Sequence, residues 1–436
     1  MISQIHKAKN FACAGSYIPN IIALALILLI LFPLAAKAQN TMDIPAILDA
    51  IRVNNPGLKM YDADIRSMDE AAKGARSWMP PEAGAGFYMT PYDTKMWKSD
   101  GMGNPGMGQF MFSAQQMFPN KSRLNAESQY MQAMSSVEKE RKNYSINELY
   151  AEAKKNYYDW MMDKRKLAIL EQDEKLLNFM IQSAELRYKN GMEKISAYYK
   201  AKAALGNVEN MRIMLESEIR QKRIALNALM YRDKQRPLEI DTFYAIKDYS
   251  GLSLDTTAFI NSRSDIKAIE KNIQLTNLQS NVERAKLKPE FGIKYDHAIA
   301  FGNLPMQFSL MGMVKIPIAP WSSKMYKANI ESIKWKTESL NQQRLMMINE
   351  AQGMTASMLA DFEAKKKQVQ LFETNIIPAL KKNYQTMQLG YEQNTEELFM
   401  LFDAWESLNM IQLEYTDQLR QLLLMQSELE RLLEIK

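Results

Sequence analysis

Residues 120–187 have the sequence NKSRLNAESQYMQAMSSVEKERKNYSINELYAEAKKNYYDWMMDKRKLAILEQDEKLLNFMIQSAELR, without a proline or a glycine. Apolar side chains recur along this stretch at helical spacing, as in Tyr157, Trp160 and Met161, and charged residues fill the positions between them. A 3.6-residue period sustained over 68 residues predicts one continuous helix or coiled-coil strand. Such a helix spans about 100 Å. A single globular domain is much narrower, so the helix must cross a distance or build the wall of a tube.

Residues 1–38 have the pattern of a cleaved export signal. A basic start precedes an apolar core over 21–34, and Ala36-Lys37-Ala38 forms an A-x-A cleavage site. The core is shorter than the roughly 20 residues that a spanning helix needs, which favours a cleaved signal over a retained anchor. The one cysteine, Cys13, falls inside this segment, so the mature chain would have no disulfide. We therefore expect packing and oligomerisation to stabilise it.

Composition excludes several classes of function. No stretch after residue 38 is apolar enough for a transmembrane helix, so any entry into a membrane would have to use β-strands. The net charge is +5 over 436 residues with acids and bases interspersed, which does not indicate a protein that binds nucleic acid. Beyond the signal the only histidine is His297, and no cysteine follows, so His/Cys zinc sites and most nucleophile–base pairs are excluded. We predict no enzyme, no catalytic residue and no cofactor.

Two segments change from the helical period to a period of two. Residues 82–118 predict a β-hairpin with a polar and an apolar face, and residues 289–318 predict a second. The alternation is clearest in Gln109, Phe110, Met111, Phe112, Ser113, Ala114 and Gln115. Residues 91–105, rich in Gly, Asp and Lys, are expected to form the loop of the first hairpin.

The chain presents the same succession of elements twice. The first repeat, residues 39–230, comprises a helix over 43–79, a hairpin, the long helix and a shorter returning helix. A linker region, residues 231–261, separates it from the second repeat, residues 262–436, at an offset of about 201 to 208 residues. Within each repeat the two shorter helices, stacked end to end, would equal the long one, which predicts a uniform wall about 100 Å long.

The predicted strands require partners. Four strands cannot close around a lumen in lipid, because open edges would leave backbone groups unpaired. Three protomers would supply a twelve-stranded barrel and a twelve-helix tube. The fold prediction is therefore mainly α with a β-barrel part: long antiparallel helices forming an α-helical barrel, plus four transmembrane strands per protomer. Two soluble hairpins packed on the helices are the alternative.

This layout resembles the TolC family of outer-membrane efflux proteins over nearly the whole mature chain. The opening of that family is similar to residues 47–56, and the opening of its second repeat is similar to Arg263-Ser264-Asp265-Ile266. The most specific match is the second helix turn, with Gly390, Tyr391, Asn394, Thr395, Leu398, Leu401, Asp403 and Ala404. The first turn matches less fully, through Arg187, Tyr188, Gly191, Ile195, Ser196 and Ala201. Pro378 also fits, and by itself predicts a local kink.

The resemblance implies a location, partners and a function. It implies a homotrimer with a β-barrel in outer-membrane lipid of a Gram-negative bacterium, and a helical tunnel in the periplasm. It also implies docking to a periplasmic adaptor (membrane fusion protein) and an inner-membrane pump, with the RND type favoured. The docking candidates are Arg187, Tyr188, Gly191, Ile195, Ser196, Gly390, Asn394, Thr395 and Leu398. The implied function is the exit channel of a tripartite efflux system. The chain resembles the heavy-metal (copper/silver or cobalt-zinc-cadmium) branch of the family, which would make heavy-metal ions its cargo. A multidrug or type I protein secretion duct is one alternative, and a periplasmic coiled-coil scaffold without a pore is another.

The resemblance also implies a periplasmic gate. Asp403 would narrow the tunnel with a ring of acids, and Tyr391 and Glu396 are further gate candidates. Three carboxylates around a threefold axis would favour cations and repel one another, which would raise their pKa. Ala197 and Met400 stand where that family often carries acids, and Glu396 where a gating basic residue can occur, so the closing contacts would differ. A solvated helix face is the other interpretation of Asp403.

The residue types at the two helix turns predict their backbone conformation independently of the resemblance. Gly191 and Asn394 are expected to adopt left-handed backbone angles where the long helices turn back. Tyr391 is expected to bridge neighbouring helices in a closed state.

Methionine is unusually abundant, with 32 residues. Thioethers are soft ligands suited to Cu(I), so a channel for heavy-metal ions could use them. The weak candidates for such a metal path are Met102, Met107, Met311 and Met313. The alternative is that methionine serves as a flexible gap-filler, which the methionines spread through the helices favour.

Overall fold

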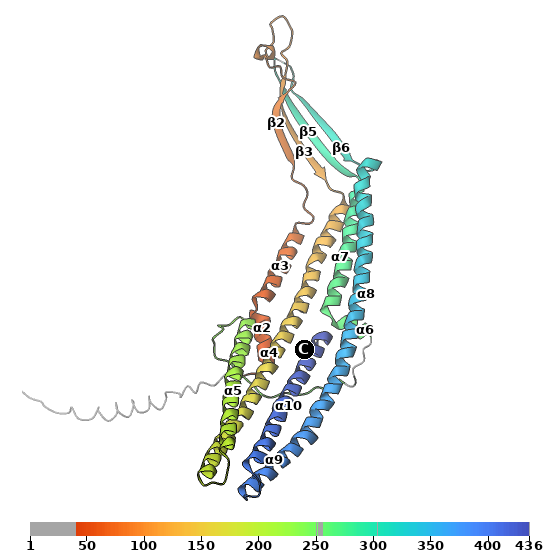
Figure 1. The fold of residues 1–436 in the computed structure, drawn as a ribbon. Helices are drawn as coiled ribbons and strands as arrows, with labels where there is room; N and C mark the ends of the chain where they lie inside the picture. The colour runs from red at the N-terminus through yellow and green to blue at the C-terminus, as the bar shows by residue number, and fades with distance from the viewer. Residues whose placement is uncertain (1–40, 250, 252–255, 303, 436) are drawn as a thin grey trace, which may run out of the picture.

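The computed structural model describes residues 41–249, 251, 256–302 and 304–435. The predicted export signal at 1–38 lies outside the described residues. The molecule is elongated, with a β-sheet at one end, helices along its length and two helix turns at the other end (Figure 1).

Helix α4 (Lys121–Lys189) confirms the predicted continuous helix. Its 69 residues span about 100 Å. Asn120 caps it, with Oδ1 accepting a hydrogen bond from the Arg123 backbone N–H at 2.8 Å. Trp160 and Met161 of the apolar stripe are buried. The helix contacts α2 (Ile44–Asn54), α3 (Pro56–Lys73), α5 (Ile195–Leu229), α7 (Ser264–Lys286) and α10 (Leu398–Leu433).

The shorter helices meet end to end through hydrogen bonds that are equivalent in the two halves. Asn55 Nδ2 donates to the Leu229 carbonyl at 3.0 Å, where α3 meets α5. Arg263 Nη1 donates to the Leu432 carbonyl at 2.8 Å, where α7 meets α10. Each stack of two short helices therefore runs beside a long helix (Figure 1).

The second long helix is interrupted where Pro378 predicted a kink. Helix α8 (Pro320–Leu371) passes through a π-helical turn, η2 (Phe372–Ile376), into α9 (Ile377–Glu392). Pro378 has no N–H, and its ring would press on the carbonyl four residues earlier in a regular helix. The wider π turn, in which the Ile377 N–H bonds to the Phe372 carbonyl, accommodates the ring.

Two predicted helix ends were wrong. The first helix was expected to reach residue 79 with an interruption near Asn55, but it stops at Lys73 because Gly74, a poor helix former, follows. The last helix of the second repeat, residues 262–436, was expected to continue to the end of that range, but α10 ends at Leu433, where Glu434 turns the backbone into the left-handed region with φ of +50°. The carboxylate of Glu434 then accepts hydrogen bonds from the N–H and the hydroxyl of Ser264, at the start of α7.

The hairpin segments lie in one antiparallel sheet of order β2-β3-β5-β6. The strands are β2 (Glu82–Tyr88), β3 (Gln109–Phe118), β5 (Glu290–Ala300) and β6 (Gln307–Lys315). The 91–105 loop contains a short 3-10 turn, η1 (Thr94–Trp97). Strand β4 (Glu239–Ile240) of the linker pairs in parallel with β1 (Thr41–Met42) at the start of the first repeat, and α6 (Thr256–Ser262) precedes α7.

The strand register separates two faces of the sheet. One row across the strands is Phe112, His297 and Phe308, and the neighbouring row on the opposite face is Ser113, Asp296 and Ser309. On the polar face, Asp296 pairs with Lys294 at 3.2 Å and accepts a hydrogen bond from Ser309 at 3.1 Å. On the apolar face, Phe308 remains 72% exposed. A sheet of this kind leaves apolar surface that a single chain does not cover.

Candidate functional site at the paired helix turns

The first turn joins α4 to α5 through a Schellman motif. Gly191 has φ of +72°, the Met192 N–H bonds to the Arg187 carbonyl at 2.9 Å, and the Gly191 N–H bonds to the Tyr188 carbonyl at 2.9 Å. Only glycine adopts this left-handed conformation without a steric cost. The predicted left-handed angle at Gly191 is confirmed.

The second turn joins α9 to α10 with the same motif. Asn394 has φ of +58°, the Thr395 N–H bonds to the Gly390 carbonyl at 2.9 Å, and the Asn394 N–H bonds to the Tyr391 carbonyl at 3.2 Å. Each position follows its counterpart in the first turn by 203 residues, as 394 − 191 shows. The left-handed angle predicted for Asn394 is confirmed, and the two turns are copies of one backbone design.

The second turn is closed further by Glu396. The Glu396 N–H bonds to the Gly390 carbonyl at 3.2 Å, and the Thr395 hydroxyl donates to the same oxygen at 3.0 Å. A Cβ at Gly390 would lie 2.5 Å from Glu396 Cγ, so a larger residue there would displace the Glu396 side chain. Glu396, predicted as a gate residue, is thus half-buried against its own turn.

A contact between Arg187 and Tyr391 connects the two turns. Arg187 Nη2 donates to the Tyr391 carbonyl at 3.0 Å, and the guanidinium carbon lies 4.0 Å from the centre of the Tyr391 ring. Tyr391 is only 3% exposed. Burial raises the pKa of its hydroxyl, although the Arg187 cation opposes that shift. A residue predicted for docking and one predicted for the gate therefore form one contact, a hydrogen bond combined with a cation–π interaction.

The other predicted residues divide between surface and core. Tyr188, Ile195, Ser196 and Asp403 are exposed. In the described part of the chain, the Asp403 carboxylate forms no hydrogen bond or ion pair. Leu398, predicted for docking, is 2% exposed and packs with Leu401 and Trp405, so its side chain is covered within one protomer. The first turn of α10 places Leu398 on the same face as the apolar core.

A buried hydrogen bond near the turns was not predicted. Trp405 Nε1 on α10 donates to Asp173 Oδ1 on α4 at 2.7 Å, and both residues are buried. Burial raises the pKa of the Asp173 carboxyl, and the Trp405 hydrogen bond opposes that shift. The sequence held a signal, because Asp173 interrupts the apolar stripe between Leu170 and Leu177.

The candidate methionines do not converge. Met102 and Met107 lie in the loop beyond β2, where Met102 is 92% exposed, whereas Met311 and Met313 lie along β6. Met313 instead faces Met117 across Gly292, because the register places all three in one row. A path through all four candidates therefore lacks support from their placement within one chain.

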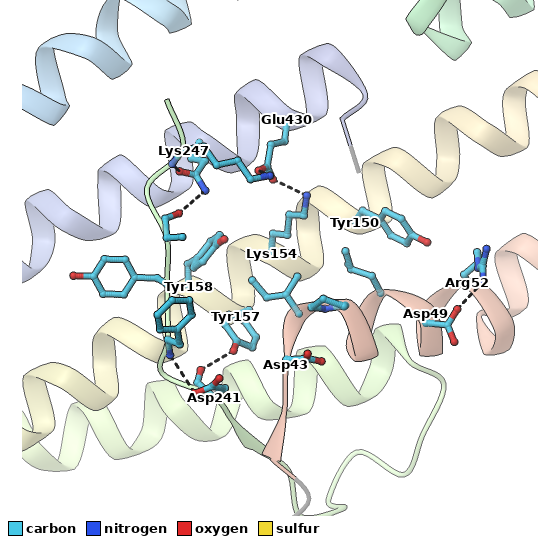
Figure 2. Close-up of a pocket in the computed structure, with 17 residues that line it drawn as sticks. Asp43, Asp49, Arg52, Tyr150, Lys154, Tyr157, Tyr158, Asp241, Lys247 and Glu430 are labelled. Atoms are coloured by element: carbon cyan, nitrogen blue, oxygen red, sulfur yellow. Dashed lines mark hydrogen bonds and ion pairs between the residues drawn. The ribbon is translucent and has the colours of Figure 1, made fainter. Parts of the chain in front are cut away.

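A cavity of about 650 Å³ lies at mid-height between α2, α4, α10 and residues 241–247 (Figure 2). On its wall, Glu430 accepts from Lys154 Nζ at 2.6 Å and from Lys247 Nζ at 2.5 Å. Burial alone would raise the pKa of Glu430, but the two ammonium groups outweigh it and hold the pKa below its usual range. Tyr157 donates its hydroxyl to the Asp241 carbonyl at 2.6 Å. These contacts fasten the linker onto α4 and α10.

Among the residues that the structure describes, no helix is long and apolar enough to span a membrane. Within the same residues, no group of three or more His, Cys, Asp or Glu side chains could hold a metal ion.

Residues 47–230 match a family model described as outer membrane efflux protein. The match covers most of the first predicted repeat and the first of the two turns. A search of curated protein sequences finds no match for the chain.

Solved structures share the fold over most of the chain. The outer-membrane channel OprN superposes with a TM-score of 0.73 at 14% identity, over 89% of this chain and 89% of its own. CusC, which forms a transmembrane channel, superposes with a TM-score of 0.72 at 16% identity, over 89% and 91%. The outer membrane protein VceC from Vibrio cholerae superposes with a TM-score of 0.71 at 15% identity, over 89% of this chain and 95% of its own. The prediction of a mainly helical chain with the fold of outer-membrane efflux channels is confirmed.

Proposed function

We propose that this chain is the outer-membrane exit channel of a tripartite efflux system, passing substrate from an inner-membrane pump and a periplasmic adaptor to the exterior. The observation that carries the proposal is the fold shared with solved outer-membrane channels. The efflux family match over residues 47–230 adds to it. A channel of this kind has no energy source, so its partners supply the pumping.

The sheet supports assembly into a homotrimer. Strands β2 and β6 form its two edges, and the apolar face exposes Phe87, Phe308 and Leu310. In lipid an unpaired edge costs several kcal/mol per backbone group. Pairing β2 of one copy with β6 of the next removes this cost, and three copies give a barrel of twelve strands in the outer membrane. The helices then form a tunnel in the periplasm.

The paired turns support a gate at the opposite end. The Arg187–Tyr391 contact fastens the α9–α10 turn to the α4–α5 turn. Asp403, exposed on α10, is available to face the axis of a trimer. We assign gating to Tyr391 and Asp403, with Glu396 supporting the turn, and adaptor docking to the exposed residues Tyr188, Ile195 and Ser196. Changing Arg187 to alanine should increase the conductance of the channel in planar bilayers.

Heavy-metal ions are one cargo for this channel, and drugs or proteins are the alternatives. A deletion strain tested against Cu(I), Ag(I), Zn(II), detergents, dyes and antibiotics separates them. Selective metal sensitivity supports metal export, and sensitivity to dyes and detergents supports multidrug export. Complementation with Met102, Met107, Met311 and Met313 changed to leucine tests the methionine path.

The class of function is tested on the purified protein. A channel should form a heat-modifiable, SDS-resistant trimer in outer-membrane fractions and should conduct ions in planar bilayers. A water-soluble monomer without conductance would support the coiled-coil scaffold instead.

A further inference from the structure

We infer that the loop between β2 and β3, together with Phe301, Gly302 and Leu304 beyond β5, forms a binding site for an acyl lipid with an anionic, phosphate-bearing headgroup. The inference rests on the proposed function, because it requires the apolar face of the sheet to lie in lipid.

The loop folds onto the apolar face of the sheet. Trp97 of η1 stacks on Phe301, with ring centres 5.1 Å apart and an angle of 12° between the planes. Trp97 also contacts Phe87 at 5.6 Å. The Phe301 N–H bonds to the Gly108 carbonyl at 3.0 Å, which extends the β3–β5 ladder, and its ring lies 6.3 Å from that of Phe87. The aromatic cluster therefore continues the surface that would contact acyl chains.

The backbone holds this arrangement in place. Trp97 Nε1 donates to the Pro91 carbonyl at 2.8 Å. A Cβ at Gly106 would lie 2.2 Å from the Trp97 carbonyl oxygen, and one at Gly302 would lie 2.3 Å from the Gly106 nitrogen. Gly302 also has φ of +67°. The two loops approach this closely because both positions are glycine, so little ordering remains to be done when a ligand binds.

The cavity between the two loops combines cations with an apolar wall. It measures about 810 Å³ and is lined in part by Lys95, Trp97, Lys98, Phe301 and Leu304. Lys95 lies in η1 and Lys98 is the residue that follows it, and both line this cavity. In the described part of the chain neither ammonium group forms an ion pair, and no acidic residue lines this cavity.

The nearby carboxylates accept hydrogen bonds from groups of the same loop. Asp93 accepts from the Lys95 N–H at 2.9 Å, and Asp100 accepts from the Met102 N–H at 3.0 Å and from Asn104 Nδ2 at 2.7 Å. Neither acid lines the cavity, so Lys95 and Lys98 are the charged groups that do, at the end of an apolar surface where a phosphate headgroup would sit above its acyl chains.

The test measures lipid retained by the full-chain assembly in detergent, by native mass spectrometry with diphosphoryl lipid A. The wild type should bind the lipid, and the double variant Lys95→Gln and Lys98→Gln should bind it about 25-fold more weakly, since each lysine contributes about fivefold. The matched control, Lys381→Gln and Lys382→Gln on the exposed surface of α9, should bind as the wild type does.

Two results would overturn the inference: equal binding by the loop variant and the wild type, or binding of inorganic phosphate alone with the same affinity as the lipid. Trp97→Ala should weaken lipid binding and leave any phosphate binding unchanged. Conductance is measured on the same preparations. A protein that conducts but does not bind the lipid overturns only this inference, and one that binds the lipid but does not conduct overturns the channel.

Discussion

Helices α4 and α8 hold equivalent places in the two halves of the chain, yet their surroundings differ. Helix α4 has α3 and α5 along one side and α7 and α10 along the other (Figure 1). Helix α8 packs against α7 and α10, and on its opposite side Trp335, Met346 and Leu371 are exposed. One helix lies inside the wall and the other at its edge. In the proposed trimer, another copy of the chain would cover this side of α8.

The largest effect, on trimer assembly, should come from placing charged side chains on the exposed side of α8. Changing Trp335 and Met346 to glutamate would bury two unpaired carboxylates in a subunit interface, at several kcal/mol each. We expect the SDS-resistant trimer to be lost, as measured by gel mobility and sedimentation. Met102→Glu, an equally apolar-to-acidic change in the outer loop, is the control and should leave the trimer intact. A trimer that survives the double change would remove α8 from the interface.

Breaking an ion pair of α4 should cost more folding stability than breaking an ion pair of α8. Glu430→Ala leaves Lys154 of α4 buried without its partner, and should lower the free energy of unfolding by about 3 kcal/mol. Lys366 of α8 pairs with Asp248 at 3.3 Å in an exposed position, so Lys366→Ala should cost less than about 1 kcal/mol. Denaturant unfolding measures the free energy of unfolding of both variants. Equal losses of stability would contradict the difference between α4 and α8.

The Glu430 pair also predicts a pH dependence. Because the pKa of Glu430 is lowered in the folded protein, its stabilising contribution is present above the ordinary carboxyl pKa and is lost as the pH falls through the folded value. The wild type and Glu430→Ala should therefore converge in stability in acid.

Asp163 gives a smaller effect of opposite sign. It is buried on α4, and burial together with Glu218 of α5 and Asp159 raises its pKa to about 7, while Arg420 of α10 and Lys166 oppose the rise. The folded protein holds this proton more tightly than the unfolded chain, so stability falls as the pH rises from about 4 to 7.

Asp163→Asn should remove that fall and raise the free energy of unfolding by about 2 kcal/mol at pH 8, with little change at pH 4. Thermal unfolding across this range is the measurement. Lys366→Gln, at the position 203 residues later on α8, where the side chain is half-buried, serves as the control without a pH-dependent gain. A uniform gain at both pH values would mean that Asp163 is not the titrating group.

The smallest expected effect is on stability, from substitutions at the left-handed positions of the two turns. Gly191→Ala places a Cβ in the left-handed region and should cost about 1 kcal/mol. Asn394→Gly should be neutral or slightly stabilising, because glycine adopts the same angle more readily. The two variants are compared by thermal unfolding, and a large loss from Asn394→Gly would show that the asparagine side chain has a role beyond the turn.

The backbone conformation of the two turns in the candidate site could be predicted from the local sequence. Gly191 and Asn394 were predicted at left-handed positions because turn chemistry depends on neighbouring residues. The partnership of Arg187 with Tyr391, the Trp405–Asp173 bond and the burial of Leu398 were not predicted. They join residues more than 200 positions apart or depend on which face of α10 meets α4.

The sequence by itself determined the long helices, the period-two hairpin segments and the turns, because hydrophobic periodicity and backbone preferences are properties of short stretches. Tertiary structure decided that α4 lies within the wall and α8 at its edge. Two helices with similar periodicity acquire different neighbours only when the whole chain is assembled. The same holds for Asp163 and Lys366, since burial and charge partners, rather than residue type, set whether an ionisable group is costly or harmless.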